Sequence, residues 1–79
     1  MENEKTVYFR DVDNKDVLVR KRESIFELEY IGKANPVWIK TTTNDPYERE
    51  FYFGEGDTCL DPITYEEAKQ RLLEWGVQI

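Results

Sequence analysis

Most of the chain before residue 54 consists of short segments in which apolar and polar residues alternate. Alternation of this kind is typical of strands with one buried and one exposed face. Turn-forming residues, chiefly Asn, Asp, Gly and Pro, separate the segments. The pattern predicts five strands, at about residues 6–12, 17–22, 25–31, 37–42 and 49–53.

One segment near the C-terminus has helical periodicity instead, and it predicts a helix over about residues 65–75. Thr64 is a good N-cap, and Glu67 three residues later completes a capping box. Gly76 suits the left-handed position at which many helices end. The apolar residues of the segment recur at helical spacing and form one stripe: Tyr65, Ala68, Leu72 and Trp75.

These elements predict a single α+β domain over residues 1–79, an antiparallel β-meander of about five strands with one C-terminal helix packed on one face. Seventy-nine residues are near the lower limit for a hydrophobic core without disulfides or metals. The helix stripe is expected to cover the sheet face formed by Val7, Phe9, Val17, Val19, Phe26, Leu28, Tyr30, Phe51 and Phe53.

The register of the second hairpin can be predicted from its charges and apolar residues. A turn centred on Glu23 and Ser24 would place Val19 opposite Leu28. On the other face, Arg20 would then lie opposite Glu27, as an oppositely charged cross-strand pair. A slip by one residue would place apolar residues opposite charges, so this register is favoured.

The sheet face left uncovered by the helix is the predicted partner-binding face. It combines large aromatic residues with arginines, which are the residue types enriched in the centres of protein interfaces. The loop before the fourth strand leaves the register of that strand open by one residue, so Trp38 can instead belong to the core. The predicted face comprises Tyr8, Arg10, Arg20, Trp38 and Tyr52.

Negative charge is concentrated in the second half of the chain, where nine acids face three bases. Residues 1–40 carry eight acids and eight bases, so the net charge of −6 belongs to residues 41–79. Such a surface repels nucleic acid and favours basic partners or cations. The predicted acidic surface comprises Asp45, Glu48, Glu55, Asp57, Asp61 and Glu66.

Residue types needed for most catalytic sites are missing from the sequence. The chain has no histidine, and its one serine, Ser24, lies in a predicted turn without a base to activate it. Cys59 lies between acids that would raise a thiol pKa, and we interpret it as a small hydrophobic residue. No nucleotide-binding or zinc motif occurs. We therefore expect no enzyme activity, no cofactor and no metal centre.

The sequence is best interpreted as a small acidic, non-catalytic protein-binding module or inhibitor, and a prokaryotic, phage or mobile-element origin is expected. One alternative is an acidic nucleic-acid mimic that blocks a basic cleft of a partner protein. A further alternative is a small-ligand or divalent-cation binder, because Glu55, Asp57 and Asp61 lie in one predicted loop.

The setting of the protein is predicted from the same composition. A single cysteine and a polar N-terminus indicate a cytoplasmic protein that binds no membrane. The partner is expected to be a protein of unknown identity, with no direct contact to nucleic acid. The chain itself is expected to be a monomer or a weak homodimer that pairs through an edge strand.

Overall fold

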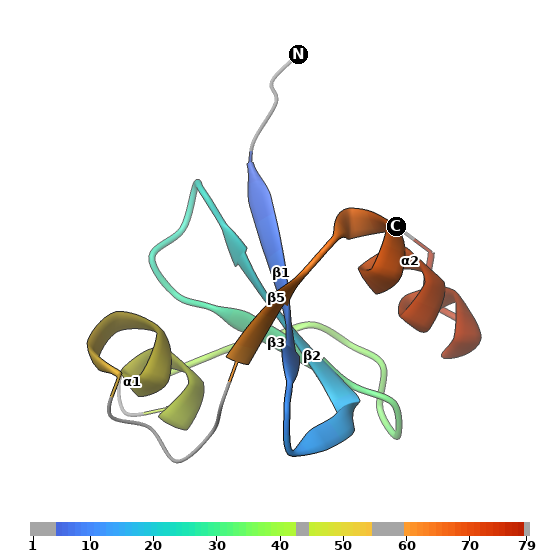
Figure 1. Cartoon of the computed structure of the whole chain (residues 1–79), viewed down its shortest axis with the longest axis horizontal. Coiled ribbons are helices and arrows are strands. Elements are labelled where there is room, and N and C mark those ends of the chain that lie inside the picture. The colour runs from blue at the N-terminus through green and yellow to red at the C-terminus, as the bar shows by residue number, and fades with distance from the viewer. Residues whose placement is uncertain (1–4, 43–44, 55–59, 79) are drawn as a thin grey trace.

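The computed structural model describes residues 5–42, 45–54 and 60–78, and it confirms the α+β fold class. Five antiparallel strands form one open sheet in the order β4-β3-β2-β1-β5 (Figure 1). The C-terminal helix α2 is present, and a second helix, α1, precedes β5. The strands are β1 (Thr6–Asp11), β2 (Asn14–Arg22), β3 (Glu29–Gly32), β4 (Ile39–Lys40) and β5 (Leu60–Ile63).

The predicted strand at 49–53 is wrong, because these residues belong to helix α1 (Pro46–Phe53). Asp45 is its N-cap and accepts the backbone N–H of Tyr47, and Pro46 occupies the first helical turn. Gly54 ends the helix in the left-handed conformation, with φ of 67°. A run of alternating aromatic residues this short fits a strand or a helix equally well, so the capping residues decide.

Helix α2 (Tyr65–Glu74) has the ends that its sequence predicts. The hydroxyl of Thr64 accepts the backbone N–H of Glu67 at 3.1 Å. At the other end, Gly76 has φ of 85°, and Val77 donates its N–H to the carbonyl of Leu72. This is the Schellman arrangement, in which the residue after the glycine packs back on the last turn. Val77 accordingly packs against the core.

The two helices lie on opposite sides of the sheet (Figure 1). Beneath α2, Leu18 and Ile31 of neighbouring strands are fully buried together with Leu72. On the other side, Phe9 and Tyr30 make ring contacts with residues of α1. Each face of this thin sheet is therefore covered by one helix, at least in part.

The expected position of α2 is wrong, because the helix packs on the opposite sheet face. Tyr8, Leu18 and Arg20 do share one face, as the alternation predicts. However, Tyr8 contacts Tyr65 of α2, while Phe9 contacts Phe51 of α1. Alternation separates two faces of a strand, but it does not decide which face a helix covers when both carry apolar residues.

The predicted register of the second hairpin is wrong by two residues. Val19 pairs with Tyr30 instead of Leu28, and Arg20 pairs with Glu29 instead of Glu27. The connection is longer than a two-residue turn, and the Lys21 ammonium donates to the carbonyl of Arg22 at the end of β2 and to that of Ile25 in the connection. A shift of two residues keeps every side chain on its predicted face.

The remaining strands are shorter or elsewhere than predicted. The fourth strand comprises only Ile39 and Lys40, because the Thr41 hydroxyl accepts the N–H of Leu28 at 3.1 Å in place of a backbone carbonyl. Strand β5 lies in the segment predicted as an acidic loop and pairs with β1 at the sheet edge. Pro62 is tolerated there because an edge strand has one unpaired side. Within the described ranges, neither helix is long and apolar enough to cross a membrane.

Candidate functional site

The residues of the predicted partner-binding face do not form one exposed surface. Tyr8 is buried, with 8% of its surface exposed, between Trp38 and Tyr65. Trp38 is half-buried and packs against the core beneath α2. Tyr52 lies on helix α1, away from the other four residues. Most of this predicted site therefore belongs to the interior of the α2 side.

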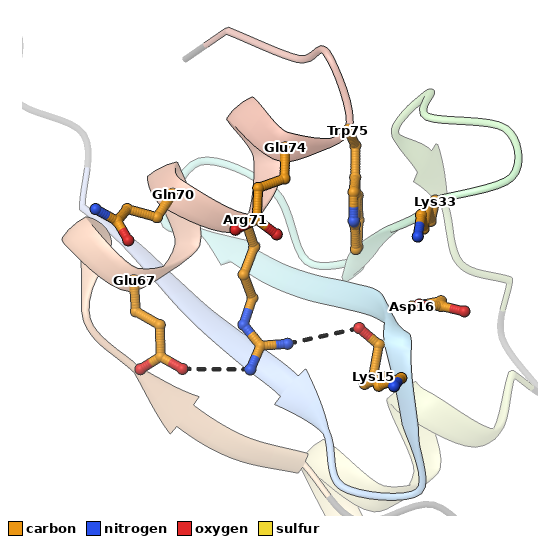
Figure 2. A pocket seen from close by; sticks show the side chains of 8 residues that line it. All are labelled: Lys15, Asp16, Lys33, Glu67, Gln70, Arg71, Glu74 and Trp75. Carbon is orange, nitrogen blue, oxygen red and sulfur yellow. Dashed lines mark hydrogen bonds and ion pairs between the residues drawn. The ribbon is translucent and has the colours of Figure 1, made fainter.

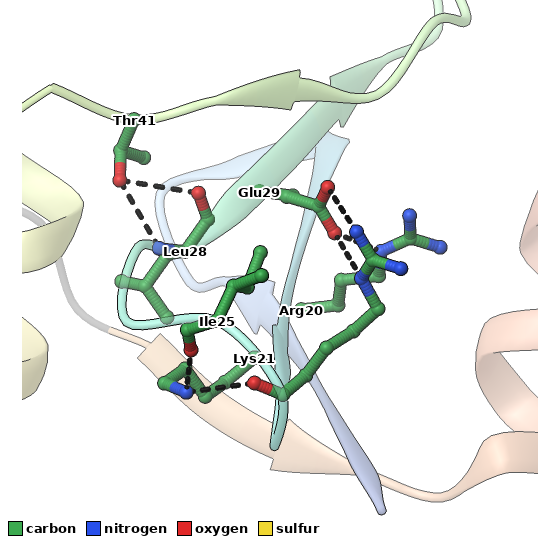
Figure 3. Close-up of polar contacts among 7 residues, drawn as sticks. Arg20, Lys21, Ile25, Leu28, Glu29 and Thr41 are labelled. Carbon is green, nitrogen blue, oxygen red and sulfur yellow. Dashed lines mark hydrogen bonds and ion pairs between the residues drawn. The ribbon is translucent and has the colours of Figure 1, made fainter. Parts of the chain in front are cut away.

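Arg20 is part of a charged cluster that links β2 and β3 (Figure 3), and it also contacts Trp38. Its Nε donates to Glu29 at 2.6 Å, and its guanidinium lies 3.9 Å from the Trp38 ring centroid. Arg22 also donates to Glu29, at 2.9 Å. Burial alone would raise the pKa of Glu29, but the hydrogen bonds and charges of the two arginines outweigh it and lower that pKa below 4.5. The cluster thus joins the two strands through one carboxylate that two guanidinium groups share.

The described members of the predicted acidic surface mostly have structural partners. Arg10 forms an ion pair of 2.9 Å with Asp61 across β1 and β5. Asp45 caps α1, and the buried Glu48 accepts the Thr41 hydroxyl at 2.6 Å. Glu66 is exposed in the first turn of α2. These four acids lie on three elements, or at their ends: β5, α1 and α2.

Glu55, Asp57 and Cys59 lie outside the described residues, so the predictions for them stay as predictions. Among residues 5–42, 45–54 and 60–78, no group of three or more acidic or cysteine residues could hold a metal ion. Asp61, the described member of the predicted cation loop, is engaged by Arg10.

Four aromatic rings form a continuous row on the α1 side of the sheet. Phe26 stacks on Tyr52, with ring centroids 4.6 Å apart and planes 7° apart. The Tyr52 ring meets Phe51 edge-on at 4.9 Å, and Phe51 meets Phe9 edge-on at 5.6 Å. We call Phe9, Phe51, Tyr52 and Phe26 the aromatic row. Its members come from β1, α1 and the loop before β3, three parts of the chain that are distant in sequence.

The aromatic row is exposed although its rings are held in place. Phe26 is 64% exposed and Phe51 is 38% exposed. The Tyr52 hydroxyl donates to the backbone carbonyl of Phe26 at 2.6 Å, which ties the loop to α1. Burial, and then the nearby charges of Glu48 and Glu27, raise the pKa of Tyr52. The hydroxyl therefore stays protonated at neutral pH and keeps its donor role.

Buried hydrogen bonds fix α1 beneath the row. Tyr47 donates its hydroxyl to Asp11 at 2.8 Å, and Asp11 is buried at the end of β1. Burial and the adjacent Asp11 carboxylate raise the pKa of Tyr47 strongly, so this donor too remains protonated. Glu48 accepts from Thr41 on the other flank of the helix. Because buried polar groups are costly to leave unpaired, these contacts hold α1 in one position.

Two of the three segments that carry the aromatic row are acidic, and the third, β1, has one acid and one base. Residues 23–28 and 45–54 contain Arg49 as their one base, against five acids: Glu23, Glu27, Asp45, Glu48 and Glu50. A partner with an apolar centre and basic surroundings would complement this composition.

Sequence reasoning assigned three members of the row, Phe9, Phe26 and Phe51, to the core. The sequence did contain a signal that would have separated them, in the helix-start pair Asp45-Pro46 and the terminating Gly54. A helix there places Phe51 and Tyr52 on a separate element. The contact with Phe26 depends on the tertiary structure, and no local pattern predicts it.

Comparison with known proteins identifies no relative. The chain matches no family model, no curated protein and no solved structure. Function is therefore argued from the geometry of the aromatic row and its surroundings.

Proposed function

We propose that this protein is a small binding module that docks a protein partner on the aromatic row. The observation that carries the proposal is Phe26, a large aromatic residue that is 64% exposed while stacked on Tyr52. Rigid aromatic anchors contribute much of the affinity at protein interfaces because little side-chain entropy is lost on binding. Exposed apolar clusters with a polar surround are typical of interaction sites.

The partner surface is expected to combine an apolar patch with lysines or arginines around it. The acids near the row would attract such a surface, raise the rate of association and set its orientation. Glu27 is the acid to test first, because its charge acts on Tyr52 within the row. Inhibition of the partner would follow if its own apolar patch is a functional site.

The proposal can be tested by affinity purification from the native host, with the wild-type chain and Phe26→Ala as parallel baits. Leu73→Ala is the matched control, because Leu73 is 49% exposed on α2, the opposite side of the sheet. With the purified partner, Phe26→Ala should weaken binding by about tenfold or more, as expected for an interface anchor. Leu73→Ala should leave the affinity unchanged.

The salt dependence of binding separates the contribution of the surface charges from the apolar contribution of Phe26. Glu27→Gln should slow association and make it less sensitive to salt, because surface charge acts mainly on encounter. A partner that binds Phe26→Ala as tightly as wild type would refute the proposed surface. Binding that disappears steeply with salt but tolerates Phe26→Ala would instead favour the nucleic-acid mimic.

A further inference from the structure

A polar hollow lies on the other side of the molecule, between α2 and the ends of β2 and β3 (Figure 2). Its volume is about 480 Å³, within the size range of small-molecule sites. Helix α2 contributes Arg71, Glu74 and Trp75, and the strand ends contribute Lys15, Asp16 and Lys33. The hollow shares no residue with the aromatic row.

The charges around the hollow are of both signs and are mostly unpaired. Among the described residues, the ammonium groups of Lys15 and Lys33 form no ion pair or hydrogen bond. Within the same ranges, the carboxylates of Asp16 and Glu74 have no such partner either. Apart from the long Arg71–Glu67 pair, the opposite charges therefore line one concave surface without ion pairs between them.

The hydrogen-bond donors of Arg71 are also incompletely satisfied within the described part of the protein. Its guanidinium lies 3.5 Å from the Glu67 carboxylate and 3.5 Å from the backbone carbonyl of Lys15. Both distances are long for charge-assisted hydrogen bonds, and a guanidinium has five N–H donors. Figure 2 shows the Arg71 side chain reaching from α2 toward β2, with its guanidinium between Glu67 and the backbone of Lys15.

Trp75 adds a flat apolar wall to this polar site. It packs against the buried cluster of Leu18, Ile31 and Leu72, which restrains the indole. It is also the C-cap of α2, where the helix dipole favours positive charge. Glu74 lies at the same end and adds a negative charge.

We propose that this hollow binds a small zwitterion, a free amino acid or dipeptide with an aromatic or large apolar side chain. Its carboxylate would lie toward Lys15 and Arg71. Its ammonium would lie toward Glu74 and the C-terminal end of α2, and its side chain would pack on Trp75. A molecule with one charge would leave charges of the other sign uncompensated. The inference goes beyond the proposed protein-binding function, since it concerns the opposite side of the sheet.

The test is a titration of the ¹⁵N-labelled full chain, followed by amide chemical shifts. The probes are L-phenylalanine, N-acetyl-phenylalanine without the ammonium, and phenylalanine amide without the carboxylate. L-phenylalanine should shift amides of residues 15–17, 32–33 and 70–76 and approach saturation by about 10 mM, since an open polar site binds weakly. Each blocked analogue should bind about threefold or more weakly, as expected when one exposed charge pair is lost.

Two charge-removing variants test the orientation of the ligand. Glu74→Gln should lower the affinity for L-phenylalanine by about threefold. It should lower the affinity for phenylalanine amide to the same degree, because both molecules carry the ammonium. Lys15→Gln should weaken N-acetyl-phenylalanine but not phenylalanine amide. Lys40→Gln on β4 is the matched control and should change nothing. Both test residues are exposed, so the variants should fold, which thermal melting verifies.

The inference is overturned if L-phenylalanine shifts no amide near the hollow by about 10 mM. Equal affinity for the zwitterion and both blocked analogues would also overturn it. Because Phe26 is remote from the hollow, loss of zwitterion binding and loss of partner binding would be separate results.

Discussion

The two sides of the sheet differ in how much of their apolar surface is exposed. Beneath α2, the aliphatic residues Leu18, Ile31 and Leu72 are fully buried. On the α1 side, four aromatic rings touch in a row whose end, Phe26, remains largely exposed. Aliphatic burial stabilises a fold without leaving a surface for partners, whereas an ordered, exposed ring can contribute to binding. Under the proposed function, the α2 side would contribute more to stability and the α1 side more to recognition.

The largest expected effect is that of Leu72→Ala in the α2 core. Removal of a fully buried leucine should lower the free energy of unfolding by about 2–5 kcal/mol. Urea unfolding followed by circular dichroism measures this loss. The adjacent Leu73→Ala serves as control and should cost about 0.5 kcal/mol or less, because Leu73 is half exposed. Equal losses in the two variants would contradict the assigned core.

Glu29→Gln should have the next largest effect, because it removes the shared acceptor of Arg20 and Arg22. We expect a loss of about 1–3 kcal/mol at pH 7, as for a hydrogen-bonded charge in a partly buried site. Asp61→Asn removes an exposed ion pair and should cost at most about 1 kcal/mol.

The Glu29 cluster also predicts a pH dependence. Because the pKa of Glu29 is lower in the folded state than its ordinary value of 4.5, its contribution to stability is complete above that value. The contribution is lost as the pH falls through 4.5 toward the folded pKa. Glu29→Gln should therefore lose less stability than wild type between neutral pH and about pH 3. Parallel acid curves for the two proteins would refute this role.

The C-terminal ends of the two helices allow a comparison in which both effects on stability are expected to be small and similar. Gly54→Ala and Gly76→Ala each place a side chain in the left-handed conformation, so each should cost about 1 kcal/mol. Open space surrounds both positions, so backbone strain alone causes the effect. Thermal melting of the two variants measures it. A much larger effect of Gly76→Ala would show that the packing of Val77 depends on this cap.

Phe26→Ala should have the smallest effect on stability. Its ring contacts Tyr52 but is mostly exposed, so we expect a loss of about 0.5 kcal/mol, the low end for an aromatic pair. The same variant is expected to show the largest loss of partner binding. A loss of stability close to that of Leu72→Ala would mean that the row is part of the core, and the contrast between the two sides would fail.

Capping and helical periodicity explain why helix α2 and both of its ends are predictable from the sequence. Thr64, Glu67 and Gly76 act within a few residues of each other, so the helix and both of its ends follow from the local sequence. The same kind of signal surrounds α1, in Asp45-Pro46 and Gly54, but alternating aromatic residues in between favoured a strand. The strand prediction gave the alternation more weight than the capping residues, although both signals are local.

Other errors involve contacts between distant residues. The predicted binding face grouped Tyr8, Arg20 and Trp38 correctly, since these side chains contact one another. The prediction did not anticipate that α2 packs on that face and buries Tyr8. The hairpin register differed because Glu29 pairs with two arginines and Lys21 bonds the loop carbonyls. When the connection between two strands is long, the turn does not fix the register, so side-chain contacts determine it.

The sequence by itself determined the α+β class, the antiparallel pairing of the first strands and the two ends of α2, because periodicity and capping are local properties. It also determined which residues share a strand face. The tertiary structure alone decided which face each helix covers, and thereby which aromatic residues are buried and which form the exposed row. The reason is that both sheet faces are apolar, so their assignment depends on the joint packing of Leu72, Phe51 and the strands between them.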